Sequence, residues 1–223
     1  VLTAAGLSPD QIKILVVNDN KLNAFVADTQ HIFINAGLIL RLNDATMLQS
    51  IIAHEAAHIA NGHLARRQIN FGTSKTAAGL GLLLAAATAL AGNTEAATGI
   101  ALGTNSAAKR RFFSHTRAEE SAADQSGIRY LARAGINPQG AVKVMEIFKG
   151  QEMLSATRQD PYARSHPLSR DRSRTIKNLV NVQTKTFSND PNAQYWFDRS
   201  QAKLSAFLRS PKWTLSILKS ETT

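Results

Sequence analysis

The sequence contains no cysteine among its 223 residues. A chain without cysteine can form neither a disulfide framework nor a thiolate metal site, so any metal ligands must be histidine, aspartate or glutamate. The absence of cysteine does not identify the cellular compartment, because cysteine-free proteins occur in both the cytosol and the periplasm. Aromatic residues make up only 6% of the chain and alanine is abundant, a composition that favours closely packed helices over a β-sandwich.

Motifs of nucleic-acid-binding proteins are also missing, although the net charge is +10. The sequence has neither a zinc-finger spacing nor a basic strand interleaved with aromatic residues, so we predict no nucleic-acid partner. The excess of lysine and arginine fits a solvated surface, an anionic lipid surface or an acidic partner. No signal peptide follows Val1, and we expect a mature or trimmed piece of a longer chain.

The chain is long enough, with 43% hydrophobic residues, for one large domain or a domain with a short extension. We place the domain at residues 1–190 and a helical C-terminal extension at 191–223. A short β-branched run closed by a polar turn predicts a strand within 11–19, and the apolar runs 23–27 and 31–35 predict a β-hairpin.

The rest of the sequence favours helices, so the expected fold is α+β and mostly α-helical, with a small hairpin or sheet. Asn43 or Asp44 is a suitable N-cap for a helix that runs to about Ile69. Further helices are expected over 116–135, from Asn137 onwards, over 169–180 and over 195–208.

A stretch of 19 uncharged residues, 76–94, is close to the roughly 20 residues that cross a bilayer. It consists mostly of alanine and glycine, which partition weakly into lipid, so we favour a helical hairpin that continues to residue 103. Its basic flanks at 66–67, 75 and 109–111 suit an anionic membrane surface. Contact with such a surface through 76–103 and a core helix with solvated ends both remain open.

The motif His-Glu-x-x-His occupies residues 54–58, within the sequence IIAHEAAHIANGH. Residues four apart lie on one face of a helix, so His54 and His58 are able to present two imidazoles to one ion. Glu55 sits beside that pair and can reach a metal-bound water without being a ligand. His63 is rotated by about 140° from His58, so we expect a surface or capping histidine there. The metzincin pattern is also rejected, because Asn61 and Leu64 stand where it needs glycine and histidine.

A later acidic segment, EESAAD, offers the missing ligand. A carboxylate from Glu120 is able to complete a His-His-Glu site, and Asp124, four residues on, can accept a hydrogen bond from a ligand imidazole. Glu119 is the rival ligand, but it lies five residues before Asp124 and points elsewhere. Favourable interaction with the helix dipole would also account for acidic residues at a helix start, although not for their pairing with the earlier motif.

These motifs together resemble the gluzincin family that contains HtpX, Oma-type proteases and the Ste-type CAAX prenyl endopeptidases. The similarity includes Glu-x-x-x-Asp-x-x-Gly at residues 120–127, the segment LNAFVADTQHIFINAGLI before the helix, and SHPLSRDR after it. It extends over about residues 10–180. Asp28 and His31 depart from it, because relatives usually have a Pro-Gly-Gly-type turn there. The layout is most similar to BepA-like periplasmic proteases, which continue into tetratricopeptide repeats, so 191–223 is expected to begin such a region.

The resemblance implies a gluzincin metallopeptidase domain with one Zn²⁺ bound by His54, His58 and Glu120. A glutamate-activated water would cleave unfolded or misassembled envelope polypeptides. His166 and Arg172 are implied as catalytic residues that stabilise the oxyanion; the alternative hypothesis for the His166 loop is that it lies over the metal and closes the site. The strand near Phe33, Ile34 and Asn35 is expected to pair with the substrate backbone.

The expected location is the periplasm, with possible membrane association and protein partners through C-terminal repeats. One alternative is a latent or chaperone-like binding module whose zinc site is structural, associated with a membrane surface or with outer-membrane assembly machinery. The presence of Glu55 favours catalysis, because a purely structural zinc site does not need it.

Overall fold

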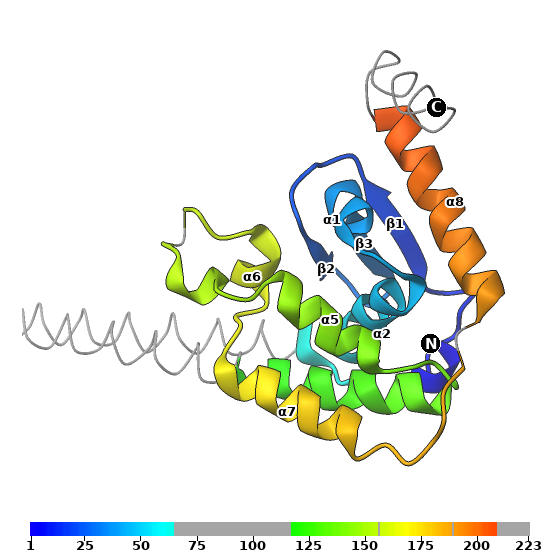
Figure 1. The fold of residues 1–223 in the computed structure, drawn as a ribbon, viewed down its shortest axis with the longest axis vertical. Helices are drawn as coiled ribbons and strands as arrows, with labels where there is room; N and C mark the ends of the chain where they lie inside the picture. The colour runs from blue at the N-terminus through cyan, green and yellow to red at the C-terminus, as the bar shows by residue number, and fades with distance from the viewer. Residues whose placement is uncertain (65–116, 156, 189, 209–223) are drawn as a thin grey trace, which may run out of the picture. The chain divides into compact units, whose positions relative to one another are not determined.

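The computed structural model describes residues 1–64, 117–155, 157–188 and 190–208 (Figure 1). The chain divides into two compact units, one made of residues 1–61 and 122–223 and the other of 62–121. The elements below belong to the first unit, except that the helix over 117–133 begins at the end of the second.

A three-stranded sheet is formed by β1 (Lys13–Val17), β2 (Ala24–Val26) and β3 (His31–Asn35), in the order β1-β3-β2. β3 pairs antiparallel with β2 and parallel with β1, which confirms the predicted strand and hairpin. The turn before β3 is closed by Asp28, whose Oδ1 accepts hydrogen bonds from the backbone N–H groups of Gln30 and His31, both at 2.8 Å. An Asx-type turn therefore leads into β3.

The remaining described elements are helical, as the sequence predicts. A short 3₁₀ helix, η1, spans Thr3–Ala5, and a second, η2, spans Gln151–Met153. Besides the 117–133 helix, the α-helices are α1 (Ala36–Arg41), α2 (Ala45–Ala60), α5 (Gln139–Ile147), α6 (Pro161–Ser165), α7 (Arg170–Asn181) and α8 (Pro191–Leu208).

The boundaries of α2 follow from its capping residues. Asp44 is the N-cap, and its side chain accepts a hydrogen bond from the N–H of Met47 at 3.1 Å. The helix ends at Ala60, earlier than the predicted Ile69, because Gly62 has a φ of 67° and breaks the helical path. The two histidines of the motif therefore lie in its last two turns.

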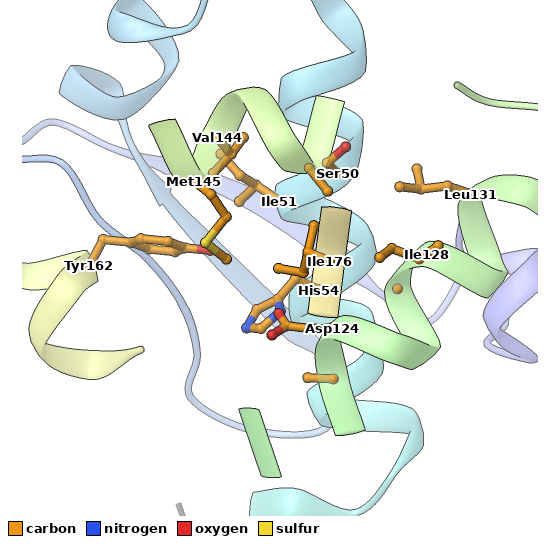
Figure 2. Close-up of a pocket in the computed structure, with 13 residues that line it drawn as sticks. Ser50, Ile51, His54, Asp124, Ile128, Leu131, Val144, Met145, Tyr162 and Ile176 are labelled. Atoms are coloured by element: carbon orange, nitrogen blue, oxygen red, sulfur yellow. The ribbon is translucent and has the colours of Figure 1, made fainter. Parts of the chain in front are cut away.

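The centre of the first unit is α2, which packs against the sheet and against α5. α5 in turn packs against α7. Figure 2 shows apolar side chains from these helices, including Ile51, Val144 and Ile176, gathered around one end of α2. Because both sides of α2 are covered, the polar side chains of its motif are enclosed together with the core.

The C-terminal helix α8 packs against α1 and α2. Phe197 is buried in the core, and the Gln201 amide donates hydrogen bonds to the carbonyls of Ile39 and Leu42 at 2.7 and 2.8 Å. α8 is helical as expected, and its assignment to a tetratricopeptide-repeat region stays a prediction.

The predicted membrane-contacting segment, 76–103, lies outside the described residues. Within the parts of the chain that the structure describes, no helix combines the length and the apolar character needed to cross a bilayer.

Replacing Asp44 with alanine is expected to lower the free energy of unfolding by about 1 kcal/mol, because α2 loses its N-cap. Burial raises the pKa of Asp44, but Lys143 at 2.6 Å, Thr46 and the Met47 N–H lower that pKa by more. The net pKa is below the ordinary value, so this stabilisation is present above about pH 4 and is lost as the pH falls through the folded pKa.

Urea unfolding of the wild type, Asp44→Ala and Asp44→Asn, at pH 7 and again below pH 4, measures this effect. Asp44→Asn should keep most of the cap, because an amide oxygen still accepts the hydrogen bond. Equal stability of the wild type and Asp44→Ala at pH 7 would contradict the assigned role.

Candidate metal centre

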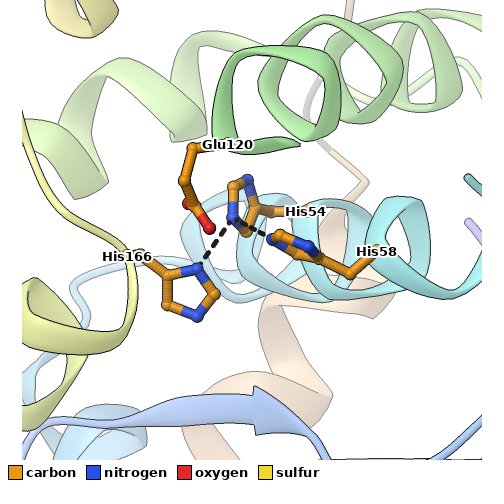
Figure 3. Close-up of side chains that lie close together, drawn as sticks. All are labelled: His54, His58, Glu120 and His166. Carbon is orange, nitrogen blue, oxygen red and sulfur yellow. Dashed lines mark hydrogen bonds between the residues drawn. The ribbon is translucent and has the colours of Figure 1, made fainter. Parts of the chain in front are cut away.

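The two motif histidines lie one turn apart on α2 and are both buried. Their ring nitrogens meet, since His54 Nε2 lies 3.1 Å from His58 Nε2 (Figure 3). His166, which follows α6, adds a third imidazole, and its Nδ1 lies 3.2 Å from His54 Nε2. Three imidazoles, from two segments that are distant in the sequence, thus converge on one point.

A fourth side chain, Glu120, completes this group. One ligand atom from each of His54, His58, Glu120 and His166 lies within 4.8 Å of the others, and all four residues are buried (Figure 3). Glu120 is therefore the acidic residue of the group, and the rival Glu119 is not a member. His63 does not join it either, but it is buried rather than exposed, which corrects the expectation of a surface histidine.

The donor atoms fit a zinc ion. Tetrahedral Zn–N bonds of about 2.0–2.1 Å place neighbouring ligand nitrogens about 3.3 Å apart, close to the separations seen here. The hydrogen-bond partners of the rings also assign the tautomers of two histidines. His54 Nδ1–H donates to Asp124 Oδ1 at 3.0 Å, and His166 Nε2–H donates to the carbonyl oxygen of Ala24 at 3.2 Å.

These tautomers leave lone pairs on His54 Nε2 and His166 Nδ1, which face each other. Two facing lone pairs repel each other, and a cation between them turns the repulsion into attraction. Either a proton on one of the two rings or a metal ion would relieve this repulsion, and Glu120 adds an oxygen ligand for a metal.

Asp124 supports the metal ligands from behind. Its oxygens accept hydrogen bonds from His54 and from Arg172, whose Nε and terminal nitrogen lie 2.7 and 2.8 Å away. Burial raises the pKa of Asp124, but the hydrogen bonds and charge of Arg172, and then those of His54, hold the pKa below its ordinary value. The carboxylate is thus ionised and contacts the Nδ1 side of the His54 ring.

Arg172 has a different position from the one expected. Besides its two bonds to Asp124, it donates to the backbone carbonyls of His166 and Pro167 at 3.3 and 2.9 Å. The guanidinium is therefore held on the Nδ1 side of His54, away from the converging ligand atoms. In this structure the arginine holds Asp124 and the His166 loop, and its predicted oxyanion role stays a prediction.

Glu55 is completely buried beside the ligands. Neither of its carboxylate oxygens accepts a hydrogen bond from the residues that the structure describes, although His166 Nε2 lies 3.3 Å from Oε1. A buried carboxylate without donors is costly in free energy unless something else compensates it. A water molecule bound at the neighbouring metal site would supply such a donor.

The predicted substrate-pairing residues, Phe33, Ile34 and Asn35, do not offer a free strand edge. They belong to β3, the central strand, whose residues pair with β1 on one side and with β2 on the other. The Asn35 N–H is also not available to a substrate backbone, because it donates a hydrogen bond to the Asn23 carbonyl at 2.9 Å. The prediction was wrong because the pairing of β1 with β3 links segments whose contact the local pattern does not reveal.

β2 is the outer strand next to the site. Its Ala24 carbonyl accepts the hydrogen bond from His166, which shows that this edge faces the metal ligands.

The glycine of Glu-x-x-x-Asp-x-x-Gly is also explained, because a Cβ on Gly127 would lie 3.3 Å from the His54 backbone nitrogen. Glycine there allows the 117–133 helix to approach α2 closely.

Sequence reasoning missed the edge carbonyl of Ala24 and the ring of Tyr162, which packs 4.7 Å from the His166 ring centre. A backbone carbonyl carries no side-chain signature, and a single tyrosine in a polar loop carries no periodic signal. Neither feature belongs to a motif that could have been found in the sequence.

Comparison with known proteins agrees with this geometry. Residues 1–180 match the profile of peptidase family M48. The chain belongs to this family. M48 peptidases are metalloproteases, and the convergence of His54, His58, Glu120 and His166 is what such an activity requires. The mostly helical fold with a small sheet beside α2 confirms the predicted fold class.

Several relatives share one description. The chain is 27% identical over 166 residues to a beta-barrel assembly-enhancing protease of Escherichia coli K12, covering 74% of this chain and 34% of the relative. It is 31% identical over 160 residues to a putative beta-barrel assembly-enhancing protease of Vibrio cholerae, covering 70% and 32%. The chain thus spans about a third of the length of the curated relatives it matches.

Replacing Asp124 with asparagine is expected to weaken zinc binding by about 10- to 100-fold, because the His54 imidazole loses its anionic partner. Competition with a zinc chelator, followed by mass spectrometry of the bound metal, measures the affinity. Asp171→Asn, an exposed acidic residue on α7, serves as the matched control. Unchanged zinc affinity in Asp124→Asn would show that Asp124 does not support the ligands.

Proposed function

We propose that this chain is a zinc endopeptidase that hydrolyses peptide bonds of unfolded or misassembled proteins. The observation that carries the proposal is the buried carboxylate of Glu55 beside four converging ligand side chains. His54, His58 and Glu120 would hold one zinc ion per chain. A purely structural site has no use for a carboxylate that is buried next to the ligands and is not itself a ligand.

Zinc, when bound, supplies a Lewis acid that lowers the pKa of a coordinated water to about 7 and polarises the substrate carbonyl. Glu55 accepts the proton of the attacking water and returns it to the leaving amide nitrogen. Asp124 keeps the His54 tautomer fixed through these proton transfers, since its charge is held by Arg172. The chain's own residues therefore provide the base, the acid and the ligand orientation.

His166 occupies two positions that a bound substrate would have to occupy. Its Nδ1 lies with the other ligand atoms, and its Nε2 donates to the carbonyl of the edge residue Ala24. If a metal were held by His54, His58 and Glu120, the His166 imidazole would lie against it and against the strand edge, so this conformation would be a closed state. When the ring leaves, both become accessible. The oxyanion role expected from the sequence is the alternative for this imidazole, and it predicts a loss of activity in His166→Ala.

The free edge of β2 is the proposed binding place for an extended substrate backbone. Main-chain hydrogen bonds to Ala24 and its neighbours would hold many sequences, because they do not depend on substrate side chains. This moves the predicted strand pairing from Phe33–Asn35 to Ala24–Val26.

The names of the relatives suggest where these substrates are. Since the matched proteins are described as beta-barrel assembly-enhancing proteases, we place this chain in the periplasm, acting on outer-membrane proteins and near their assembly machinery. Further protein partners would bind to tetratricopeptide repeats, and segment 76–103 would contact a membrane surface.

The contact of the His166 imidazole with the ligand group favours a second function, that of a latent binding module. If the imidazole stays on the metal, the zinc site is latent and the chain acts as a chaperone-like binding module. The two functions differ in one measurable property, which is proteolysis.

Glu55→Gln is expected to retain zinc and to lose casein degradation by at least about 100-fold, because the general base is gone. Zinc content by mass spectrometry and casein digestion by gel analysis measure the two properties. Glu120→Gln is the complementary variant and should lose zinc. A wild type that binds zinc without degrading casein would favour the latent module, and equal activity of Glu55→Gln would contradict the mechanism.

His166→Ala is expected to increase casein degradation several-fold, because the closed state loses its contacts to the ligands and to Ala24. Initial rates for the wild type and the variant at equal zinc content measure this. His31→Ala, which removes a histidine of β3 outside the ligand group, is the control. Unchanged or lower activity in His166→Ala would count against the closing role of the imidazole.

A further inference from the structure

β1 is the outer strand of the sheet on the side opposite β2 (Figure 1). Among the described strands it pairs with β3 alone, and the helices that contact the sheet pack mainly against β2 and β3. Its three central residues are large and apolar, yet Ile14 is 40% exposed, Leu15 39% and Val16 51%. β1 therefore presents an apolar edge that the described part of the chain leaves exposed to solvent.

Alternate residues of β1 direct their backbone groups away from the sheet. The Lys13 N–H donates to the Gln30 carbonyl at 2.8 Å, and Lys13 lies opposite His31 in the parallel ladder. Successive residues of an extended strand point their N–H and C=O groups to opposite sides, so those of Ile14 and Val16 point outwards. Among the described residues these outward groups have no hydrogen-bond partner. Such a row is a template for one more strand.

The features that usually block the edge of a sheet are missing from β1. Outer strands are commonly protected by proline, by inward-pointing charges, by a bulge or by a covering loop. The sequence of β1, Lys-Ile-Leu-Val-Val, has no proline, and its single charge is on Lys13 at the end. Its ladder with β3 runs without an interruption in register. β1 is therefore suited to pairing with another chain.

A second copy of the chain fits this edge in one defined register. If a two-fold axis passes beside Leu15, this residue faces its own counterpart, and Ile14 faces Val16 of the second copy. The backbone groups of Leu15 point towards β3, so the central pair is of the closely spaced kind without hydrogen bonds. The Ile14–Val16 pairs on either side are then hydrogen-bonded, and every outward N–H and C=O of both residues is satisfied. The apolar side chains of the two strands also cover one another.

The charges near β1 favour the same antiparallel arrangement. Lys13 begins the strand, and Asp19 follows two residues after its end. Antiparallel pairing places Lys13 beside the end of the other β1, near Asp19 of that copy, and keeps the two lysines about 14 Å apart along the strands. A parallel pairing would instead place the two lysines side by side. Opposite charges thus meet at both ends of the antiparallel pair.

We propose that two copies of this chain associate through β1, antiparallel about Leu15, and join their two three-stranded sheets into one sheet of six strands. Both β2 strands, with the candidate metal centres beside them, then lie at the outer ends of this sheet. Association therefore leaves both centres accessible, and it does not depend on the proposed peptidase activity. A strand pair of five residues is a small interface, so the dimer should dissociate on dilution.

Sedimentation velocity over a wide range of chain concentrations tests this association. The wild type should pass from monomer to dimer as the concentration rises. Leu15→Lys and Leu15→Glu should each weaken the dimer at least about tenfold, because like charges would face each other at the axis. An equimolar mixture of these two variants should recover the dimer, since opposite charges then face each other. Met153→Lys is the matched control, because Met153 is 79% exposed and lies in η2, outside the sheet.

The absence of cysteine from the chain allows a second test, which measures the register. Leu15→Cys should form a disulfide between copies on mild oxidation, because the Cα atoms of a pair without hydrogen bonds lie about 4.5 Å apart. Lys13→Cys should not cross-link with itself, but it should cross-link with Val17→Cys in a mixture, since these positions face each other. Gel electrophoresis without reducing agent measures the products, and the melting temperature confirms that each variant is folded.

A wild type that stays monomeric at every concentration would overturn the proposal. A dimer that persists in Leu15→Lys and does not cross-link in Leu15→Cys would also overturn it, because another surface would then join the copies. Labelled β-casein that binds to a monomeric wild type but not to Leu15→Lys would overturn it as well, and would assign this edge to extended polypeptides instead.

Discussion

The convergence of imidazole nitrogens at the end of α2 is the constraint on which the rest of the structure depends. His54 and His166 present lone pairs to each other at 3.2 Å, an arrangement that is unfavourable without a cation between them. A buried site of this kind needs rigid support, because each ligand ring must keep one tautomer and one orientation. The packing of α2 between the sheet and α5 supplies that rigidity.

The residues that hold the candidate ligands contact one another in a ring. Arg172 holds Asp124 and the carbonyls of His166 and Pro167, Asp124 holds His54, and His54 meets His166. The loop that closes the site and the residue that orients a ligand therefore share one guanidinium. Arg172 thus contacts both the backbone of the His166 loop and the carboxylate that holds His54.

Local sequence patterns predicted much of this arrangement. The spacing of His54 and His58 works because a helix turn brings residues four apart to one face, and the Asp44 cap and Gly62 fix where that helix begins and ends. The β-hairpin followed from two short apolar runs around a polar turn. The acidic segment EESAAD supplied Glu120 and Asp124, which share one face of the 117–133 helix, and the resemblance then made their pairing with the earlier motif specific.

The sequence by itself determined the chemistry of the donor atoms: with no cysteine, a His-Glu-x-x-His helix and a later acidic helix leave nitrogen and oxygen ligands for zinc. Only the tertiary structure decided which roles the remaining residues take. β3 has no free edge because β1 pairs with it in parallel, and Arg172 donates hydrogen bonds to Asp124. Those outcomes depend on contacts between segments distant along the chain, which local periodicity does not encode.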